Sequence, residues 1–291
     1  MIKKSVVVVG GSGSVGKGIY QCFSQEYFDI YDVQITHFSN PQYNSKFLDI
    51  TNRISIIDFF KNYKPDVIVF CAGLKDITAC DKNRELTFSI NVICFEQFLN
   101  HIPKGTKFIY ISTDYVFNGL DGYYDDKALK DPKTYYGITK SLAEDFLLSS
   151  ELDFKIVRTS AVITEGSKFL DYSINTLNDN LPLHLYSDIF FSPTAVLTLA
   201  RAINRLIENF IITDRILHIA GERYSRYVFI EKMLKGNKKI SLLRDDKYFD
   251  SQNAVIDFQK DLSMLTSSVF YDLYQNNEIL LMKSFKNLLQ N

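Results

Sequence analysis

Residues 5–24 read S-V-V-V-V-G-G-S-G-S-V-G-K-G-I-Y-Q-C-F-S. The run from Ser5 to Val9 is rich in β-branched residues, which is typical of a central parallel strand covered on both faces. Glycines follow at once, and residues 17–24 have a helical composition. Glycines allow a tight turn and a close backbone approach to a pyrophosphate, which the N-terminus of a helix attracts. The stretch therefore predicts a dinucleotide-binding turn, and a merely structural turn is the alternative.

Strand-like and helix-like segments alternate outward from this turn. We expect strands within 31–38 and at 47–51, 67–71 and 107–112, with helices at 54–63 and 85–99. Such alternation predicts an α/β fold, a Rossmann-type doubly wound parallel sheet. After Thr159 the alternation breaks, which indicates a smaller, mostly helical C-terminal substrate domain. We expect residues 1–160 plus about 190–220 to form the dinucleotide-binding domain, and about 161–189 plus 221–291 to form a substrate-binding lid.

Composition narrows the function classes. The net charge is -1 over 291 residues, so no basic field attracts nucleic acid or anionic lipid. No stretch has the length and apolarity of a membrane span, and the first apolar run is shorter than a signal-peptide core. The four cysteines show no metal-binding spacing, which indicates free thiols in a reducing compartment. We expect a cytoplasmic protein without a metal site.

Candidate cofactor contacts cluster where the expected strands end. The second strand lacks the terminal acid that usually binds the adenosine ribose of NAD. Thr36, His37 and Ser39 can accept a 2′-phosphate there, which favours NADP(H), with NAD(H) as the alternative. Asp49 can meet the adenine amino group, and the small residues after the fourth strand let the chain approach a ribose. The complete set is Gly10, Ser12, Gly13, Ser14, Val15, Gly16, Thr36, His37, Ser39, Asp49, Ile50, Cys71, Ala72, Gly73, Asn91, Tyr136 and Lys140.

The stretch Ser112–Lys140 has the residue types that carbonyl reduction needs. It begins S-T-D-Y-V-F-N-G at a strand end and finishes Y-G-I-T-K at a helix start. Residues four apart share a helix face, so Tyr136 and Lys140 can point into one pocket. A lysine ammonium stabilises a phenolate and lowers the pKa of a proton-donating tyrosine. Thr113 at the strand end can hydrogen-bond a substrate carbonyl.

Two other interpretations of these residues exist. A second Y-x-x-x-K match, Tyr123 and Lys127, lies among glycines and aspartates, a loop composition in which that spacing means little. The alternative to catalysis at Tyr136 and Lys140 is a surface tyrosine and lysine beside a core threonine. The combination with a dinucleotide turn favours catalysis.

Taken together, these motifs resemble the extended short-chain dehydrogenase/reductases. The segments S-T-D-Y-V-F-N-G, Y-G-I-T-K, K-I-V-R-T-S (155–160) and F-S-P-T (191–194) carry the likeness. Three more, V-V-G-G-S-G-S-V-G, L-D-I-T-N and P-D-V-I-V-F-C-A-G, make the pattern most similar to the dTDP-4-dehydrorhamnose reductase group. The resemblance covers nearly the whole chain and is loose beyond Thr194.

The resemblance implies an NAD(P)H-dependent reductase of a nucleotide-activated 4-keto-6-deoxy sugar, serving surface polysaccharide biosynthesis. Hydride would pass from the nicotinamide to the sugar C4 carbonyl, and Tyr136 would supply the proton. Lys140 would bind the ribose, and Thr113 would take the family's Ser/Thr role. Candidate substrate contacts are Lys75, Asp114, Val116, Phe117, Ala161 and Arg223. Arg223 and the nearby Arg226 are candidate partners of the substrate pyrophosphate, or else solvated surface arginines.

Some positions depart from the family pattern. Ala161 stands where the family often has an aromatic residue that can stack on the sugar. Lys17 and Gly18 stand where some members hold magnesium through a Glu. The loop Leu74–Thr78 is similar to the non-catalytic regulatory β subunit of methionine adenosyltransferase. An epimerase or dehydratase on the same scaffold, and a non-catalytic NADP-binding regulatory subunit, remain alternatives. A homodimer is one possible assembly.

Overall fold

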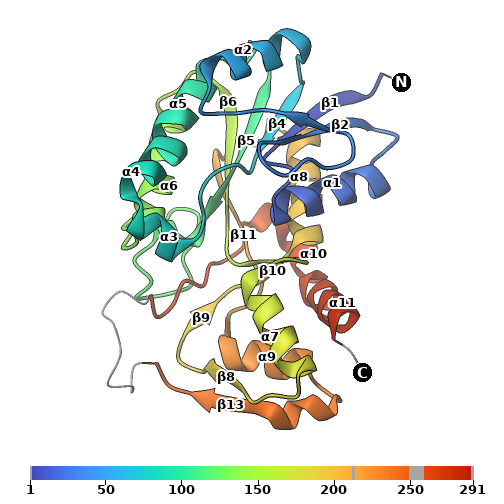
Figure 1. The fold of residues 1–291 in the computed structure, drawn as a ribbon, viewed down its shortest axis with the longest axis vertical. Coiled ribbons are helices and arrows are strands. Elements are labelled where there is room, and N and C mark those ends of the chain that lie inside the picture. Colours follow the sequence, from blue (N-terminus) through green and yellow to red (C-terminus); the bar gives the residue numbers. More distant parts are fainter. Residues whose placement is uncertain (1, 212–213, 249–258, 290–291) are drawn as a thin grey trace.

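The structure, a computed structural model, describes residues 2–211, 214–248 and 259–289. Its largest element is a seven-stranded sheet with strand order β11-β6-β5-β4-β1-β2-β3, in which every neighbouring pair is parallel. The strands are β1 (Lys4–Val9), β2 (Tyr31–His37), β3 (Ser45–Phe47), β4 (Val67–Phe70), β5 (Lys107–Thr113), β6 (Asp153–Thr159) and β11 (Ile216–Ile219). The predicted Rossmann-type doubly wound sheet is confirmed (Figure 1).

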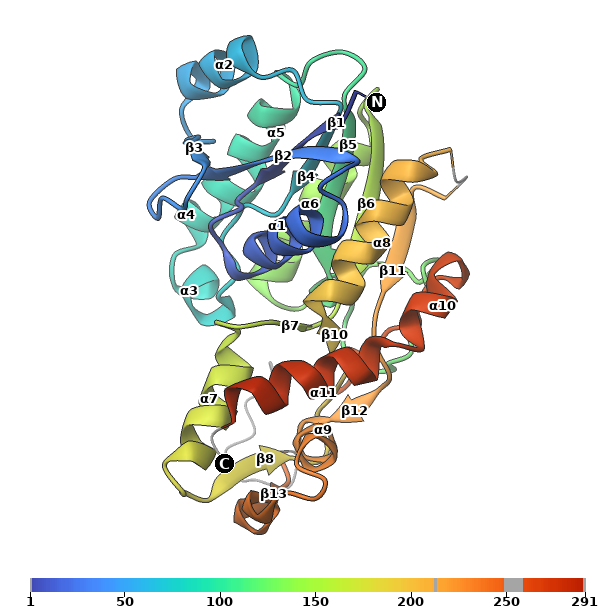
Figure 2. The same ribbon diagram turned by 90° about the vertical axis from the view of Figure 1, so that its right-hand side faces the viewer.

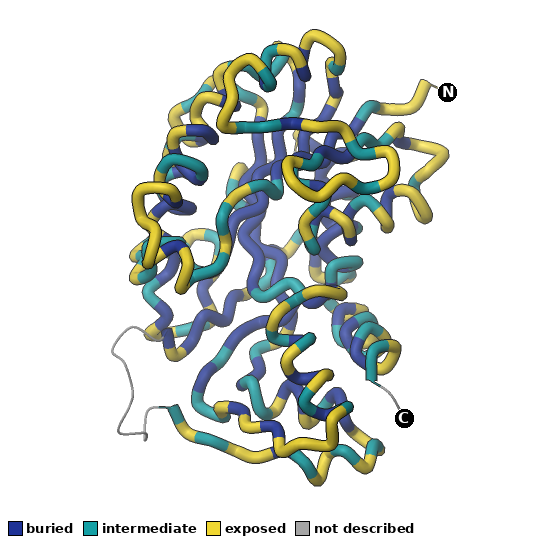
Figure 3. The backbone as a smooth tube through the Cα atoms, viewed as in Figure 1, coloured by how far each residue is buried: buried dark blue, intermediate teal, exposed yellow. Residues whose placement is uncertain are grey.

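Helices cover both faces of this sheet. On one face lie α1 (Ser14–Glu26) and α8 (Val196–Glu208), and on the other pack α2 (Arg53–Asn62), α5 (Cys94–Leu99) and α6 (Tyr135–Leu148). Side chains alternate along a strand, so Val6 and Val8 of β1 enter the first core while Val7 and Val9 enter the second. Figure 3 shows the resulting buried sheet between more exposed helices.

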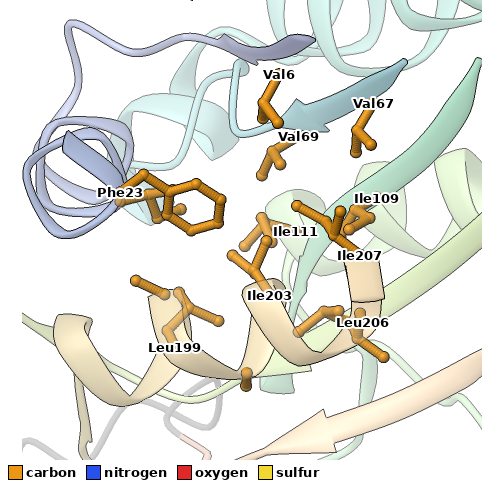
Figure 4. Packing of buried hydrophobic residues seen from close by; sticks show 14 of the residues in the cluster. Val6, Phe23, Val67, Val69, Ile109, Ile111, Leu199, Ile203, Leu206 and Ile207 are labelled. Atoms are coloured by element: carbon orange, nitrogen blue, oxygen red, sulfur yellow. The ribbon is translucent and has the colours of Figure 1, made fainter. Parts of the chain in front are cut away.

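The core beneath α1 and α8 explains the apolar strands of the sequence. Figure 4 shows Val69, Ile109 and Ile111 of the sheet facing Phe23 of α1 and Ile203 of α8. None of these side chains is more than 8% exposed. Burial of each contributes about 1.5–3 kcal/mol to the folded state. This packing fixes the carboxyl ends of the strands, where the candidate residues lie.

The helix expected at 85–99 consists of three consecutive pieces. After α3 (Ile77–Lys82), α4 (Arg84–Phe88) runs into a π-helical turn at Ser89–Ile93 and then into α5. A π turn inside an α-helix often marks a functional position. Asn91 lies at the centre of this turn and is 5% exposed.

One strand begins earlier than the sequence predicts. The structure has β3 at Ser45–Phe47, so the predicted strand at 47–51 is wrong in its bounds. Asp49 ends the extended backbone, because its Oδ1 accepts hydrogen bonds from the Thr51 N–H (2.8 Å) and hydroxyl (2.6 Å). A carboxylate that bonds the backbone two residues ahead favours a turn over a strand.

The C-terminal region adds helices and short strand pairs beneath the sheet (Figures 1 and 2). The helices are α7 (Lys168–Asn178), α9 (Arg226–Met233), α10 (Tyr271–Tyr274) and α11 (Asn277–Leu288), with 3-10 turns at Lys238–Leu242 and Ser268–Phe270. The strand pairs are β7 (Val162–Ile163) with β10 (Thr194–Ala195), β8 (Leu183–Tyr186) with β13 (Leu243–Asp246), and β9 (Phe190–Phe191) with β12 (Tyr224–Ser225). A separate hydrophobic cluster joins α7, α9 and α11. The division into two domains at the stated boundaries remains a prediction.

Within the described residues, no helix is long and apolar enough to cross a membrane. The same part of the chain holds no group of three or more His, Cys, Asp and Glu side chains that could bind a metal ion.

Candidate active site

The turn between β1 and α1 has a shape that requires glycine. Gly10 has φ 77, and a Cβ on it would lie 2.7 Å from the Ala72 backbone nitrogen. A Cβ on Gly16 would lie 2.6 Å from the Gly10 carbonyl oxygen. The Gly13 N–H donates to that same carbonyl (3.0 Å) and closes the turn. The turn therefore forms a backbone cradle at the N-terminus of α1, and these residues fit the pyrophosphate of a dinucleotide.

Thr36, in β2, holds this turn in place. Its hydroxyl accepts a hydrogen bond from the Gly10 N–H (3.1 Å), and its carbonyl accepts one from the Ser12 N–H (3.2 Å). The Thr36 side chain is 2% exposed. Thr36 therefore orders the cradle, and its binding of a 2′-phosphate stays a prediction.

The other residues expected near the adenosine lie around the ends of β2 and β3. His37 is half-buried, with Nδ1 2.7 Å from Ser45 Oγ, whereas Ser39 is exposed. Asp49 is half-buried, and one of its oxygens is already engaged in the turn after β3. Ile50 packs against the core beneath α2. Their binding of a cofactor stays a prediction.

The loop after β4 is held from behind by Asn91. Its Oδ1 accepts a hydrogen bond from the Leu74 N–H (2.8 Å), and its Nδ2 donates to the Leu74 carbonyl (2.9 Å). Gly73 has φ 141, and a Cβ on it would lie 2.9 Å from Asn91 Oδ1. Burial raises the pKa of the Cys71 thiol to about 12, so the thiol is protonated at neutral pH. Asn91 thus shapes the cofactor side of the site through the loop backbone.

Lys75 lies across the mouth of the glycine turn. Its Nζ donates to Ser14 Oγ (3.0 Å), and Val15 beside Ser14 packs against the first core. Burial lowers the pKa of Lys75. Lys75, which was expected near the substrate, therefore lies next to the glycine turn that is expected to bind the cofactor.

Thr113, Tyr136 and Lys140 gather at the end of β5. Thr113 is the last residue of the strand, Tyr136 is the second residue of α6, and the two side chains are hydrogen-bonded. One turn further along α6, Lys140 Nζ donates to the Ile111 carbonyl of β5 (2.9 Å). The competing tyrosine and lysine at 123 and 127 lie outside any helix. The structure therefore brings together the three residues that the sequence selected.

The start of α6 is set by two local features. Thr134 caps the helix, because its hydroxyl accepts a hydrogen bond from the Gly137 N–H (3.1 Å). A Cβ on Gly137 would lie 2.1 Å from the Tyr115 carbonyl oxygen, so only glycine permits this close approach. The Tyr115 ring then meets the Tyr136 ring edge-on at 5.8 Å. Tyr136 is thereby fixed beside the end of β5.

Burial raises the pKa of Tyr136 above its ordinary value, and its hydrogen bond with Thr113 acts in the opposite direction. Lys140 is not among the groups that shift this pKa. Its Nζ lies 4.0 Å from the centroid of the Tyr110 ring instead. The lowering of this pKa by Lys140 therefore stays a prediction. Tyr136 is protonated at neutral pH, which is the form that a proton donor requires.

Asp114 begins a 3-10 turn, Asp114–Val116, directly after Thr113. Its Oδ1 accepts a hydrogen bond from the Thr113 hydroxyl (3.1 Å), and its Oδ2 accepts one from the Ser160 hydroxyl (2.6 Å). Burial raises the pKa of Asp114 to about 6, against these hydrogen bonds and the charge of Arg226. A partly desolvated carboxylate therefore lies beside the candidate catalytic threonine.

The two candidate arginines differ in their surroundings. Arg223 is paired with the buried Asp261 at 2.8 Å, so its guanidinium is already occupied. Arg226 is stacked on the rings of Phe191 (4.1 Å) and Phe169 (4.7 Å), and within the described residues it forms no ion pair. Its charge acts on the carboxylate beside the catalytic threonine. Arg226 is therefore the arginine whose charge acts on Asp114, and the substrate contacts of both arginines stay predictions.

Three other expected substrate contacts show little surface. Val116 and Phe117 are fully buried, and the Phe117 ring stacks on Tyr124 at 4.3 Å. They form a wall behind the site, without a side-chain surface of their own. Ala161 is half-buried, and its carbonyl accepts a hydrogen bond from the Thr194 N–H (3.0 Å).

A buried charge network behind the site is missed by the sequence reasoning. Glu144 of α6 is fully buried and bidentate to Arg158 of β6, at 3.0 and 2.7 Å. The Ser112 hydroxyl donates to the same carboxylate (2.6 Å). Arg158 also lies 3.5 Å from His218 Nε2, and burial lowers the pKa of that imidazole to about 4. The available signal was the helical spacing, since Glu144 follows Lys140 by four residues.

Comparison with known proteins identifies the family. The sequence profile of the RmlD substrate binding domain matches residues 4–244. The chain belongs to this family. Among curated relatives, the spore coat polysaccharide biosynthesis protein SpsK of Bacillus subtilis (strain 168) is 30% identical over 208 residues, 70% of each chain. The dTDP-4-dehydrorhamnose reductase of Aggregatibacter actinomycetemcomitans is 25% identical over 75% of this chain and 73% of its own.

Solved structures place the whole chain in the RmlD fold. The crystal structure of dTDP-4-dehydrorhamnose reductase from Bacillus anthracis str. Ames, in complex with NADP, has a TM-score of 0.83 and 25% identity, covering 98% of this chain and all of that one. The predicted resemblance to dTDP-4-dehydrorhamnose reductases is confirmed, and the chain is an oxidoreductase of the short-chain dehydrogenase/reductase class. The same neighbour agrees with the predicted preference for NADP(H). Methionine adenosyltransferase 2 subunit beta of Xenopus tropicalis is also similar, at 21% identity over 61% of this chain.

Proposed function

We propose that this RmlD-family protein reduces a nucleotide-activated 4-keto-6-deoxy sugar at C4 with NADPH, in the biosynthesis of a surface polysaccharide. The observation that carries the proposal is the meeting of Thr113, Tyr136 and Lys140 at the end of β5, on the same edge of the sheet as the glycine cradle. Ligands of doubly wound sheets bind at this carboxyl edge.

Each residue has one role in the proposed reaction. Bound NADPH supplies the hydride that the carbonyl carbon receives. Tyr136 donates the phenolic proton to the carbonyl oxygen, so that the C=O bond becomes C–OH and the phenolate remains. Thr113 has a single hydroxyl proton, which it gives to Asp114 in the structure, and in the reaction this proton would hydrogen-bond the carbonyl oxygen instead. Lys140 exchanges its bond to the Ile111 carbonyl for the hydroxyls of the nicotinamide ribose.

The substrate's anionic end is assigned to Arg226. Its guanidinium is partly desolvated on two aromatic faces and has no carboxylate paired to it among the described residues, so it can form bidentate bonds with a phosphate. His37 and Ser39 are the proposed contacts of a 2′-phosphate, since Thr36 is engaged by the turn.

The test is a set of dTDP-, GDP- and UDP-4-keto-6-deoxy sugars incubated with the protein and NADPH, with nicotinamide absorbance followed over time. We expect one NADPH oxidised per ketone reduced with at least one sugar. Turnover of a sugar without net NADPH oxidation would indicate an epimerase or dehydratase. NADPH binding without turnover of any sugar would favour the regulatory interpretation, which the similarity to methionine adenosyltransferase 2 subunit beta also supports.

A further inference from the structure

Glu144 ties the helix that carries the catalytic pair to the two strands beside it. Its carboxylate lies on α6, accepts the Ser112 hydroxyl from β5 and forms two hydrogen bonds with Arg158 from β6. Ser112 and Arg158 are register partners in the sheet, so one carboxylate clamps both strands at the same level. Ser112 directly precedes Thr113. These hydrogen bonds therefore help to fix the distance between α6 and the end of β5.

Glu144 is also the carboxylate whose charge acts on Lys140. The groups that act on Lys140 are Glu144, four residues along the same helix, and Cys71 at the end of β4. The thiol of Cys71 is protonated at neutral pH, and the Tyr110 ring beneath Lys140 belongs to a buried phenol whose pKa burial raises further. Among the described residues, Glu144 is thus the carboxylate whose charge acts on Lys140. Two cations face that carboxylate from other elements: Arg158 of β6 at 2.7 Å, and Lys130, which precedes α6, at 3.7 Å.

Burial works against the charge on Lys140. It lowers the pKa of the ammonium to about 8, and the charge of Glu144 opposes that fall. Without the carboxylate, the same desolvation would act unopposed, and the ammonium would lose its proton at lower pH. A buried carboxylate one helical turn from a desolvated lysine is therefore placed to preserve the lysine's charge near neutral pH.

We propose that Glu144 is a positioning residue with two tasks: it fixes α6 against the end of β5, and it keeps Lys140 in the ammonium form that the reaction uses. The proposal rests on the proposed function for the use of that charge, although the protonation of Lys140 can be measured without any substrate. The alternative is that Glu144 and Arg158 form a buried ion pair that contributes only to folding.

The test compares Glu144→Gln with the double variant Glu144→Gln/Arg158→Met, in which no unpaired guanidinium stays buried. The matched control is Asp145→Asn, because Asp145 is the adjacent acid on α6 and is 57% exposed. It pairs at 2.6 Å with Lys130, which also lies 3.7 Å from Glu144, so this variant also shows what Lys130 contributes. The direct readout is the pH titration of the Lys140 Cε resonance in protein labelled with 13Cε-lysine, assigned by its loss in Lys140→Met. The second readout is the pH profile of kcat/KM with NADPH and the reducible sugar.

In the unsubstituted protein we expect the Lys140 titration, and the alkaline fall of kcat/KM, near pH 8. Glu144→Gln should lower both midpoints by about one pH unit, because an opposite charge at this range shifts a pKa by that order. The double variant also removes the positive charge of Arg158, so its midpoints should fall less. Asp145→Asn should leave both midpoints unchanged. An unchanged Lys140 resonance midpoint in Glu144→Gln would overturn the proposal, whatever its stability. If no sugar is reduced, the proposed function fails while the resonance still decides the role of Glu144.

Discussion

Substitution of Tyr136 by Phe is expected to lower kcat/KM for ketone reduction by about 10²–10⁴-fold, the usual contribution of a general acid. The ring of Tyr136 would remain against Tyr115, so the fold and the cofactor cradle should be unaffected. The affinity for NADPH, measured by the fluorescence of the bound nicotinamide, should therefore be retained. The rate loss arises because the proposed reaction transfers the phenolic proton of Tyr136 to the carbonyl oxygen, and phenylalanine has no such proton.

Tyr135→Phe is the matched control for this prediction. Tyr135 is the neighbouring tyrosine on α6, and the guanidinium of Arg84 lies 5.1 Å from its ring, away from Thr113. Its substitution removes an identical hydroxyl and should leave kcat/KM near the original value. Activity near the original level in Tyr136→Phe would refute the assignment of the acid.

Substitution of Arg226 by Met is expected to raise KM for the nucleotide sugar by about 10- to 100-fold, since a hydrogen-bonded ionic contact contributes about 1.5–3 kcal/mol. The methionine side chain can still pack between Phe169 and Phe191, so the aromatic contacts of α9 are preserved. The affinity for NADPH should not change. Steady-state kinetics with varied sugar at saturating NADPH measure the effect.

The variant Arg223→Met distinguishes the role of Arg223 from that of Arg226. It leaves the carboxylate of Asp261 buried without its partner, so the expected effect is a loss of folding stability of about 3–5 kcal/mol, measured by urea denaturation. KM for the sugar should stay close to its original value in the folded fraction. A large rise of KM in Arg223→Met, with none in Arg226→Met, would restore the assignment that the sequence favoured.

Local chemistry explains which parts of the site the sequence could predict. The glycine turn follows from the spacing of residues within one strand–turn–helix unit, and the pairing of Tyr136 with Lys140 follows from one turn of helix. The β-branched run of β1 likewise reports burial on both faces. These features need no knowledge of the neighbouring elements, and the structure has the predicted sheet, turn and helix.

Features that depend on contacts between distant segments were not predictable in the same way. In the sequence Thr36 has the character of a polar strand end, and only the fold shows that its hydroxyl accepts a hydrogen bond from the Gly10 N–H. Arg223 and Arg226 are three residues apart and look equivalent in the sequence. Asp261, 38 positions beyond Arg223 in the chain, forms an ion pair with Arg223 and not with Arg226. The partner of each polar group decided its role.

The position of the Lys140 ammonium was not predictable for a related reason. Helical spacing puts the two side chains on one face, but it does not fix where the ammonium points. In the structure the ammonium is directed to the Ile111 carbonyl and the Tyr110 ring. Glu144 occupies the next turn of the same face, and its burial depends on Arg158 from another strand. Helical periodicity predicts which face of α6 a side chain lies on, whereas tertiary packing decides which groups it contacts.

Hydride transfer from the nicotinamide to C4 of a 4-keto sugar is the central step of the proposed reaction. The most direct measurement uses NADPH carrying deuterium at the transferred C4 position, with the product analysed by NMR. The account predicts one deuterium at C4 of the reduced sugar for each NADPH oxidised, and a single configuration of the new hydroxyl. Sugar conversion with no deuterium at C4, or no conversion of any 4-keto sugar while NADPH is bound, would contradict it.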